Sequence, residues 1–175
     1  MKNYIYIAVL LLAVYLILTK SKGKMSGSAR ANRIPASQVK TDSKLVEHIK
    51  KWEGYHANPY PSLEGGADTI GYGHKMIGQQ YTYLDKDQAI ELLKKDIVNR
   101  GEDIVRRKLG NRSVTQREFN LLTDLAFGTG TIYNHVLASL DNGTLEKDYN
   151  KKAITINGEF SQGLLNRRND ALKNL

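Results

Sequence analysis

Residues 4–19, YIYIAVLLLAVYLILT, form an apolar run that contains no charged residue, no Gly and no Pro. Such a run has no polar face, so it does not suit the surface of a globular domain in water. As a helix that rises about 1.5 Å per residue, it would span roughly 24 Å, slightly less than a hydrocarbon core of about 30 Å. Lys2 and Lys20 flank the run and can reach the lipid headgroups. We therefore predict one N-terminal transmembrane helix within residues 1–20.

A cleaved signal peptide is the alternative interpretation of the same run. Its clearest cleavage site, the small residues from Ser26 to Ala29, follows three lysines, and only one Lys precedes the run. Both features are poor matches to a signal peptide, so an uncleaved anchor is favoured. The orientation stays open, because lysines after the run favour a cytoplasmic C-terminal side. The chemistry inferred below requires the opposite side.

The net charge of +8 is concentrated beside the apolar run. Residues 20–40 contain six basic and no acidic residues, whereas residues 41–175 contain 19 basic and 18 acidic residues. Because residues 21–40 are rich in Ser, Gly and Lys and have no apolar face, we predict a flexible basic linker. A basic arm next to a membrane span faces acidic lipid or sets the orientation of the span. Binding of nucleic acid through the arm is the less favoured alternative.

The sequence lacks the residues that several kinds of functional site require. The chain has no cysteine, which excludes disulfides, thiolate zinc sites and a cysteine nucleophile. Its four histidines are scattered without the spacing of metal ligands, and the sequence carries no Gly-rich phosphate-binding motif.

Residues 41–175 have the length of one domain, and their first part combines a helix with short strands. Leu45, Ile49 and Trp52 recur at helical spacing and predict a helix that ends near Glu53. Residues 54–83 are dense in Gly, Pro, Tyr and Thr, which is typical of strands joined by turns.

From Asp85 to the C-terminus the pattern predicts helices. Asp85 with Gln88, and Thr115 with Glu118, have the spacing of capping boxes that open helices. Gly143 suits the end of a helix over residues 135–142. We predict an α+β fold with a small β lobe followed by a mainly helical lobe.

Glu53 is a candidate general acid. It ends a helix whose other face is apolar, and the turn-rich strand segment follows it directly. A carboxyl group that lies against apolar packing beside a cleft can retain its proton and donate it. From position alone an ordinary surface glutamate remains the simpler interpretation.

The surrounding motifs resemble the phage-type lysozymes of glycoside hydrolase family 24. Those enzymes have a Glu-Gly pair, a Tyr seven residues after the Glu, and a Thr-Ile-Gly-x-Gly-His strand. Here the matching residues are Glu53-Gly54, Tyr60 and Thr69-Ile70-Gly71-Tyr72-Gly73-His74. Supporting matches lie in the helical part: Leu84–Ala89, Thr115–Gly130 and Gly163–Arg168. The likeness covers most of residues 43–175 and leaves out the predicted anchor and linker.

This resemblance implies a muramidase that cleaves the β-1,4 bond between N-acetylmuramic acid and N-acetylglucosamine in peptidoglycan. Glu53 then matches the general acid, and Thr69 matches the threonine that helps to hold the attacking water. His74 matches a histidine that braces the cleft, and we group it with Ser62 and Tyr72 as candidate substrate-binding residues. The resemblance implies no metal and no organic cofactor, and we expect a monomeric catalytic domain.

One departure from the family concerns the second catalytic group. The family has an acidic residue or a cysteine two positions after the Tyr, where this chain has Ser62, and the loop 61–68 is one residue longer. An inverting glycosidase needs a second carboxylate roughly 6.5–9.5 Å from the acid to activate water. Glu64 or Asp68 could supply it. We favour Glu64, because in an extended chain its side chain would lie on the same face as that of Ser62, two residues earlier. The side chain of Asp68, which directly precedes Thr69, would lie on the opposite face from that of Thr69.

Two alternatives need no second carboxylate. A lytic transglycosylase uses a single acid, because the 6-hydroxyl of the sugar replaces water. An inactive wall-binding module or a structural virion protein would retain the fold without the reaction. We expect a membrane-anchored enzyme whose domain faces peptidoglycan, either at the host inner membrane or at the internal membrane of a lipid-containing virion.

Overall fold

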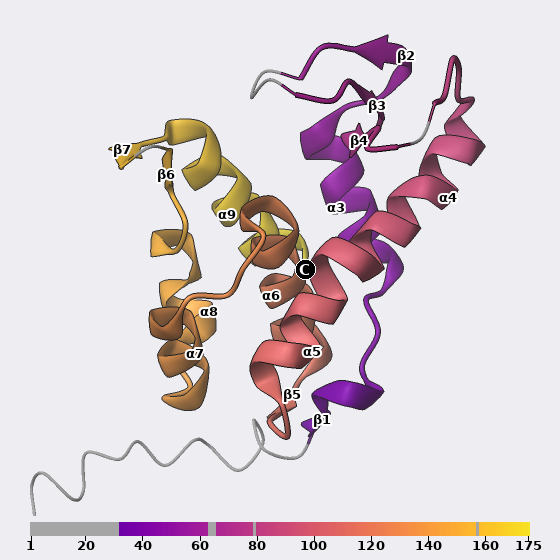
Figure 1. Cartoon of the computed structure of the whole chain (residues 1–175). Coiled ribbons are helices and arrows are strands. Elements are labelled where there is room, and N and C mark those ends of the chain that lie inside the picture. The colour runs from indigo at the N-terminus through magenta and orange to yellow at the C-terminus, as the bar shows by residue number, and fades with distance from the viewer. Residues whose placement is uncertain (1–31, 63–65, 79, 157) are drawn as a thin grey trace, which may run out of the picture.

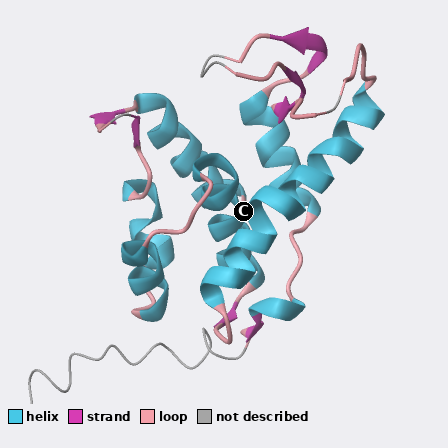
Figure 2. Cartoon of the chain, in the orientation of Figure 1, coloured by secondary structure: helices cyan, strands magenta, loops and turns pink. Residues whose placement is uncertain are grey.

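The computed structural model describes residues 32–62, 66–78, 80–156 and 158–175, and within them it confirms the predicted α+β architecture. Figure 1 shows a helical body with a three-stranded sheet, in the order β2-β3-β4, at one end of it. Figure 2 shows that helices make up most of the remaining chain. No helix within the described ranges is long and apolar enough to cross a membrane. The predicted anchor at residues 4–19 lies outside these ranges.

The folded part begins earlier than residue 41, the boundary that the sequence predicted. Strand β1 (Ile34–Pro35) pairs antiparallel with β5 (Ser113–Val114), and the 3-10 helix η1 (Ala36–Gln38) follows β1. Ala36 and Val39 are buried in the core. The second half of the predicted linker therefore packs on the domain, where the backbone N–H of Ala36 donates a 3.0 Å hydrogen bond to the carbonyl oxygen of Arg112.

Helix α3 (Ser43–Glu53) is the predicted first helix, and it ends where the sequence indicated. Asp42 caps its N-terminus by accepting a 3.1 Å hydrogen bond from the backbone N–H of Lys44. Gly54 follows the last residue with φ +72°, a conformation that favours glycine. The helix thus stops at Glu53 and turns the chain into the sheet.

The β lobe consists of β2 (His56–Tyr60), β3 (Thr69–Gly71) and β4 (His74–Lys75). His56 pairs with Gly71 and Tyr60 pairs with Thr69, so β2 carries extra residues between these two pairs. Pro59 lies in this irregular part, where a missing backbone N–H does least harm.

Helices α4 (Lys86–Asp96), η2 (Ile97–Glu102) and α5 (Asp103–Leu109) connect the β lobe to the far end of the body. The predicted capping box at Asp85 and Gln88 is confirmed. The middle segment, η2, is a π-helix that the sequence did not predict. Its Gly101 packs so tightly that a Cβ there would lie 2.6 Å from Cγ2 of Thr123.

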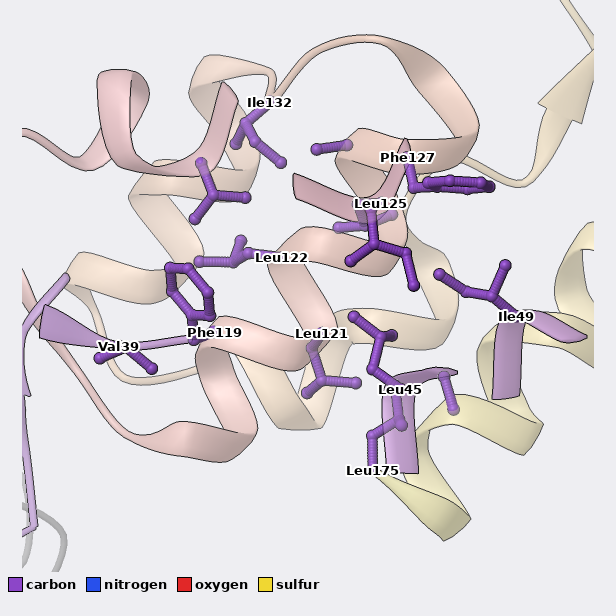
Figure 3. Close-up of a cluster of buried hydrophobic side chains, with 14 of the residues drawn as sticks. Val39, Leu45, Ile49, Phe119, Leu121, Leu122, Leu125, Phe127, Ile132 and Leu175 are labelled. Carbon is purple, nitrogen blue, oxygen red and sulfur yellow. The ribbon is translucent and has the colours of Figure 1, made fainter. Parts of the chain in front are cut away.

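Helix α6 (Gln116–Thr129) runs through the centre of the molecule, and the capping box at its start is confirmed. Figure 3 shows its apolar side chains packed among those of the surrounding elements. Phe127, near the end of this helix, is 3% exposed and belongs to the core.

The sequence predicted only helices in the chain after α6, but this part of the chain also contains a β-hairpin. Helices α7 (Asn134–Asp141), α8 (Leu145–Asp148) and η3 (Tyr149–Lys151) precede a hairpin of β6 (Thr155–Ile156) and β7 (Glu159–Phe160). Gly143 follows α7 with φ +70°, as expected for a helix end. The last helix, α9 (Gln162–Asn174), packs against α3 and α6.

Candidate active site

The carboxylate of Glu53 lies where the helical lobe meets the β lobe. Its Oε1 accepts a 2.8 Å hydrogen bond from Nη1 of Arg167 on α9. Its Oε2 lies beside Gly73, where a Cβ would come within 3.1 Å of that oxygen. Gly73 also has φ +81°, so both conformation and space favour glycine there. Because 27% of the Glu53 side chain is exposed, the carboxyl group is partly shielded from water and still accessible.

Strands β2 and β3 place Tyr60 and Thr69 next to each other, since the two residues are partners in the antiparallel ladder. Paired residues present their side chains on the same face of the sheet. Burial and, as a smaller cause, the nearby Glu53 carboxylate raise the pKa of Tyr60. Tyr60 therefore lies within the electrostatic field of Glu53, and Thr69 is its neighbour across the ladder.

The residues considered for the second carboxylate lie in the loop between these strands. Glu64 lies outside the described residues, and Ser62 is half-buried. Asp68 is exposed whereas Thr69 is buried. The two neighbours therefore face in different directions, as the alternation along a strand predicts.

Tyr72 and His74 have structural contacts that bear on their predicted roles. Tyr72 is 8% exposed, and its ring centroid lies 5.6 Å from that of Tyr55. This burial argues against stacking of Tyr72 on a sugar ring. Nδ1 of His74 lies 2.8 Å from Oδ2 of Asp96 on α4. His74 thus links β4 to α4 and braces the β lobe, in line with the bracing role that the resemblance implies.

A buried charge network holds Arg167 against Glu53. The Nε and Nη2 atoms of Arg167 donate hydrogen bonds of 3.0 and 2.8 Å to Oδ1 of Asp124, which is fully buried on α6. Arg168 and the Tyr149 hydroxyl bind the other carboxylate oxygen of Asp124. Burial alone would raise the pKa of Asp124, but its positive neighbours outweigh burial and hold that pKa far below its usual range.

Sequence reasoning assigned no role to this network. One signal was present, because Asp124 stands within the apolar run LLTDLAF of a helix that must be buried. A charge in such a place requires partners of opposite charge. The sequence does not indicate which of its 26 basic residues these partners are.

Among the described residues, no group of three or more His, Asp and Glu side chains is placed to hold a metal ion. Within the described residues, the site combines the partly exposed carboxylate of Glu53, the buried ion pair of Arg167 and Asp124 behind it, and Tyr60 and Thr69 on the sheet beside it.

Three solved structures with the same fold are the endolysin Lyz of phage P1, a lysozyme variant of phage P22 and the muramidase domain of SpmX from Asticaccaulis excentricus. Their sequence identities to this chain are 18%, 23% and 23%, with TM-scores of 0.65, 0.62 and 0.59. Each match covers 78% of this chain, and 85%, 97% and 97% of the respective structure. A comparison with curated protein sequences gave no match.

The family model described as phage lysozyme matches residues 50–171. That range includes Glu53, the sheet and Arg167, and it covers well over half of the chain. The chain therefore belongs to the phage lysozyme family and is a glycoside hydrolase.

Proposed function

We propose that the protein is a muramidase that cleaves the β-1,4 bond between N-acetylmuramic acid and N-acetylglucosamine, with Glu53 as the general acid. The observation that carries this proposal is the placement of the Glu53 carboxyl group. It ends α3 beside the sheet, partly exposed, and Arg167 and Gly73 fix its position. The three structural neighbours are described as an endolysin, a lysozyme and a muramidase domain, which supports the same reaction.

The ion pair with Arg167 holds the Glu53 carboxyl group in place, with 2.8 Å between Nη1 and Oε1. Arg167 also donates two hydrogen bonds to Asp124, and the charge of Asp124 offsets that of the guanidinium. Arg167 can therefore fix the position of Glu53 while exerting only part of its charge on it.

Thr69 would hold the attacking water, and Glu64 would act as the base that removes its proton. Asp68 is exposed and faces away from Thr69, which supports Glu64 over Asp68 as the base. We expect Glu64→Gln to abolish most of the activity and Asp68→Asn to retain it. If both variants keep wild-type activity, the hydrolytic mechanism with a loop base is wrong.

A lytic transglycosylase is the second candidate. Ser62 favours it, because a serine stands where the family has an acidic residue or a cysteine and cannot deprotonate water efficiently near neutral pH. In that mechanism Glu53 first donates its proton to the leaving oxygen as the glycosidic bond breaks. It then accepts the proton of the sugar 6-hydroxyl as that oxygen bonds to the anomeric carbon, and no loop carboxylate is needed.

We further propose that residues 4–19 anchor the domain in a lipid bilayer, with the cleft facing the peptidoglycan. Figure 1 shows β1, where the described chain begins, at the end of the molecule opposite to the sheet β2–β4. A tether attached at β1 would thus leave Glu53 directed away from the bilayer. The host inner membrane and the internal membrane of a lipid-containing virion both fit this arrangement. Fractionation of the full chain with membranes, resistant to high salt and alkaline washing, would support the anchor, and release by salt would contradict it.

Zymography on purified peptidoglycan tests the role of Glu53. We expect wild type to clear the gel and Glu53→Gln to lose clearing by at least two orders of magnitude, as removal of a general acid predicts. Glu91→Gln is the matched control, because Glu91 is an exposed glutamate on α4 that pairs only at the surface with Lys94. Clearing that survives Glu53→Gln refutes the site, and wall binding without any clearing supports the inactive-module alternative.

A further inference from the structure

Arg100 connects the central helix α6 to the turn of the sheet that lies against the candidate acid. It belongs to the π-helix η2, and it is half-buried. Its guanidinium carbon lies 4.5 Å from the centroid of the Phe127 ring on α6. Its Nη1 donates a 3.3 Å hydrogen bond to the backbone carbonyl oxygen of Gly73, in the turn between β3 and β4. None of the motifs that resemble phage-type lysozymes includes Arg100.

The close packing of η2 on α6 explains how the guanidinium comes to lie over the ring. Gly101 directly follows Arg100, and a Cβ at Gly101 would lie 2.6 Å from Cγ2 of Thr123 and 3.8 Å from Cβ of Phe127. The missing side chain therefore lets the backbone of η2 approach α6. A π-helical turn is rare, and such turns are frequent at functional sites.

The chemistry of the side chain suits both contacts at once. The N–H groups of a guanidinium form a fixed, planar array, and a guanidinium over an aromatic ring is attracted by the ring electrons. Arg100 can therefore be held by Phe127 and still donate to Gly73. The turn is fixed at the next residue as well, because Nδ1 of His74 lies 2.8 Å from Oδ2 of Asp96 on α4.

Gly73 links Arg100 to the candidate acid. A Cβ at Gly73 would lie 3.1 Å from Oε2 of Glu53 and 3.7 Å from its carboxyl carbon, so the backbone of the turn packs against the carboxyl group. The other oxygen, Oε1, binds Arg167. The Glu53 carboxyl group is thus confined by two groups, and an arginine takes part in each of these contacts.

Helix α6 supports both arginines. Asp124 binds Arg167 through hydrogen bonds of 3.0 and 2.8 Å, and Phe127 lies beneath the guanidinium of Arg100. Residues three positions apart lie on the same face of a helix, so one face of α6 carries both supports. The position of the acid therefore depends on α6 along two routes, of which the route through Arg100 is independent of the buried ion pair.

We propose that Arg100 is a positioning residue for the reaction, which fixes the backbone of Gly73 and thereby the Glu53 carboxyl group. The proposal rests on the proposed role of Glu53 as the acid. A general acid must lie within hydrogen-bond reach of the leaving oxygen, and a small displacement slows the chemical step. Without the donor at residue 100, the turn loses one of its two attachments, and Oε2 loses the fixed surface beside it.

The kinetics of Arg100→Met test this proposal, with the full chain acting on soluble strands of peptidoglycan that are not cross-linked. Met retains a long apolar side chain against Phe127 and has no hydrogen-bond donor. We expect kcat to fall by about tenfold or more while KM stays within about twofold of wild type. Arg107→Met is the matched control, because Arg107 is exposed on α5, and it should retain both constants.

Two outcomes of this experiment would overturn the proposal. A raised KM with unchanged kcat would mean that Arg100 contacts the substrate and does not act through Gly73. A lower melting temperature with unchanged kcat per folded molecule would mean that Arg100 only stabilises the fold. Retention of activity by Glu53→Gln overturns the proposed function instead, so the two failures are distinguishable.

A double-mutant cycle identifies the route through Gly73. Arg100→Met and Gly73→Ala both displace the same carboxyl group, so their combined effect on kcat should be clearly smaller than the product of the single effects. Arg100→Met combined with Gly78→Ala should give the product, because Gly78 has open space around it and a similar φ. Multiplicative effects in both pairs would overturn the proposal.

Arg100→Lys covers the case in which Arg100→Met does not fold. The ammonium group keeps the positive charge near the Phe127 ring but lacks the planar array of donors and the reach of a guanidinium. We expect this variant to fold and its kcat to fall by about threefold or more, again with little change in KM. A folded Arg100→Lys with the kcat of wild type would overturn the need for the guanidinium.

Discussion

Asp124→Asn is the substitution whose effect on stability follows most directly from the structure. Asp124 is fully buried, and Arg167, Arg168 and the Tyr149 hydroxyl all bind its carboxylate. Asparagine retains the shape and one acceptor oxygen but removes the charge that compensates two guanidinium groups. Removal of one partner from a buried ion pair costs about 3–5 kcal/mol. Because Asn still accepts a hydrogen bond, we expect the free energy of unfolding to fall by an amount near the lower end of this range, about 3 kcal/mol at pH 7.

The same substitution has a pH signature. The pKa of Asp124 is far lower in the folded protein than in the unfolded chain, where it is about 3.9. A depressed pKa contributes stability that is present above the unfolded value and is lost as the pH falls below it. One pH unit below that value, wild type should have lost about 1.4 kcal/mol from this group. The variant has no such group, so the difference of about 3 kcal/mol should shrink to about 1.6 kcal/mol near pH 2.9.

Urea unfolding followed by circular dichroism at pH 7 and near pH 3 measures both quantities. Asp141→Asn is the control, because Asp141 forms an exposed ion pair with Arg112 and should change stability by less than about 1 kcal/mol. A gap between wild type and Asp124→Asn that stays constant with pH would refute the assigned charge state of Asp124. An Asp124→Asn variant as stable as wild type would refute the network itself.

Two glycine substitutions test the packing on either side of the site. Gly73→Ala should lower activity at least tenfold, because Gly73 has φ +81° and the added Cβ would displace Oε2 of Glu53. Gly78→Ala is the control, since Gly78 has a similar φ and open space around it, and this substitution should affect only stability. Equal activities of the two variants in a turbidity assay would contradict this prediction. Gly101→Ala should reduce the free energy of unfolding by about 1–3 kcal/mol, since its Cβ would lie 2.6 Å from Cγ2 of Thr123. An unchanged urea midpoint would contradict this, because it would mean that η2 and α6 move apart to admit the methyl group without loss of stability.

The elements with strong local signals could be predicted from the sequence. The first helix ends at Glu53 as predicted, because an apolar face followed by Gly54 specifies both the helix and its stop. The capping boxes at Asp85 and Thr115 are present, because their hydrogen bonds involve residues three positions apart. Such features depend on neighbours in the chain, so no knowledge of tertiary structure is required.

The features that depend on distant partners could not be predicted. Strand β1 exists only because it pairs with β5, and the hairpin β6–β7 has two-residue strands that show no measurable alternation. The π-helix η2 lies between two α-helices, and one extra residue per turn over so short a segment does not visibly change the spacing of apolar residues in the sequence. For the candidate site, Glu53 and Thr69 are predicted from motifs, whereas Asp124 and Arg167 come together from two helices that are distant in the sequence.

The measurement that tests the central claim most directly is mass spectrometry of the muropeptides that the full chain releases from purified peptidoglycan, with Glu53→Gln and Glu91→Gln run in parallel. Our account predicts fragments with reducing muramic acid ends from wild type and Glu91→Gln, and none from Glu53→Gln. Fragments lighter by one water, with 1,6-anhydro ends, would show the transglycosylase reaction in place of hydrolysis. Release of the same fragments by Glu53→Gln would contradict the assignment of Glu53 as the general acid.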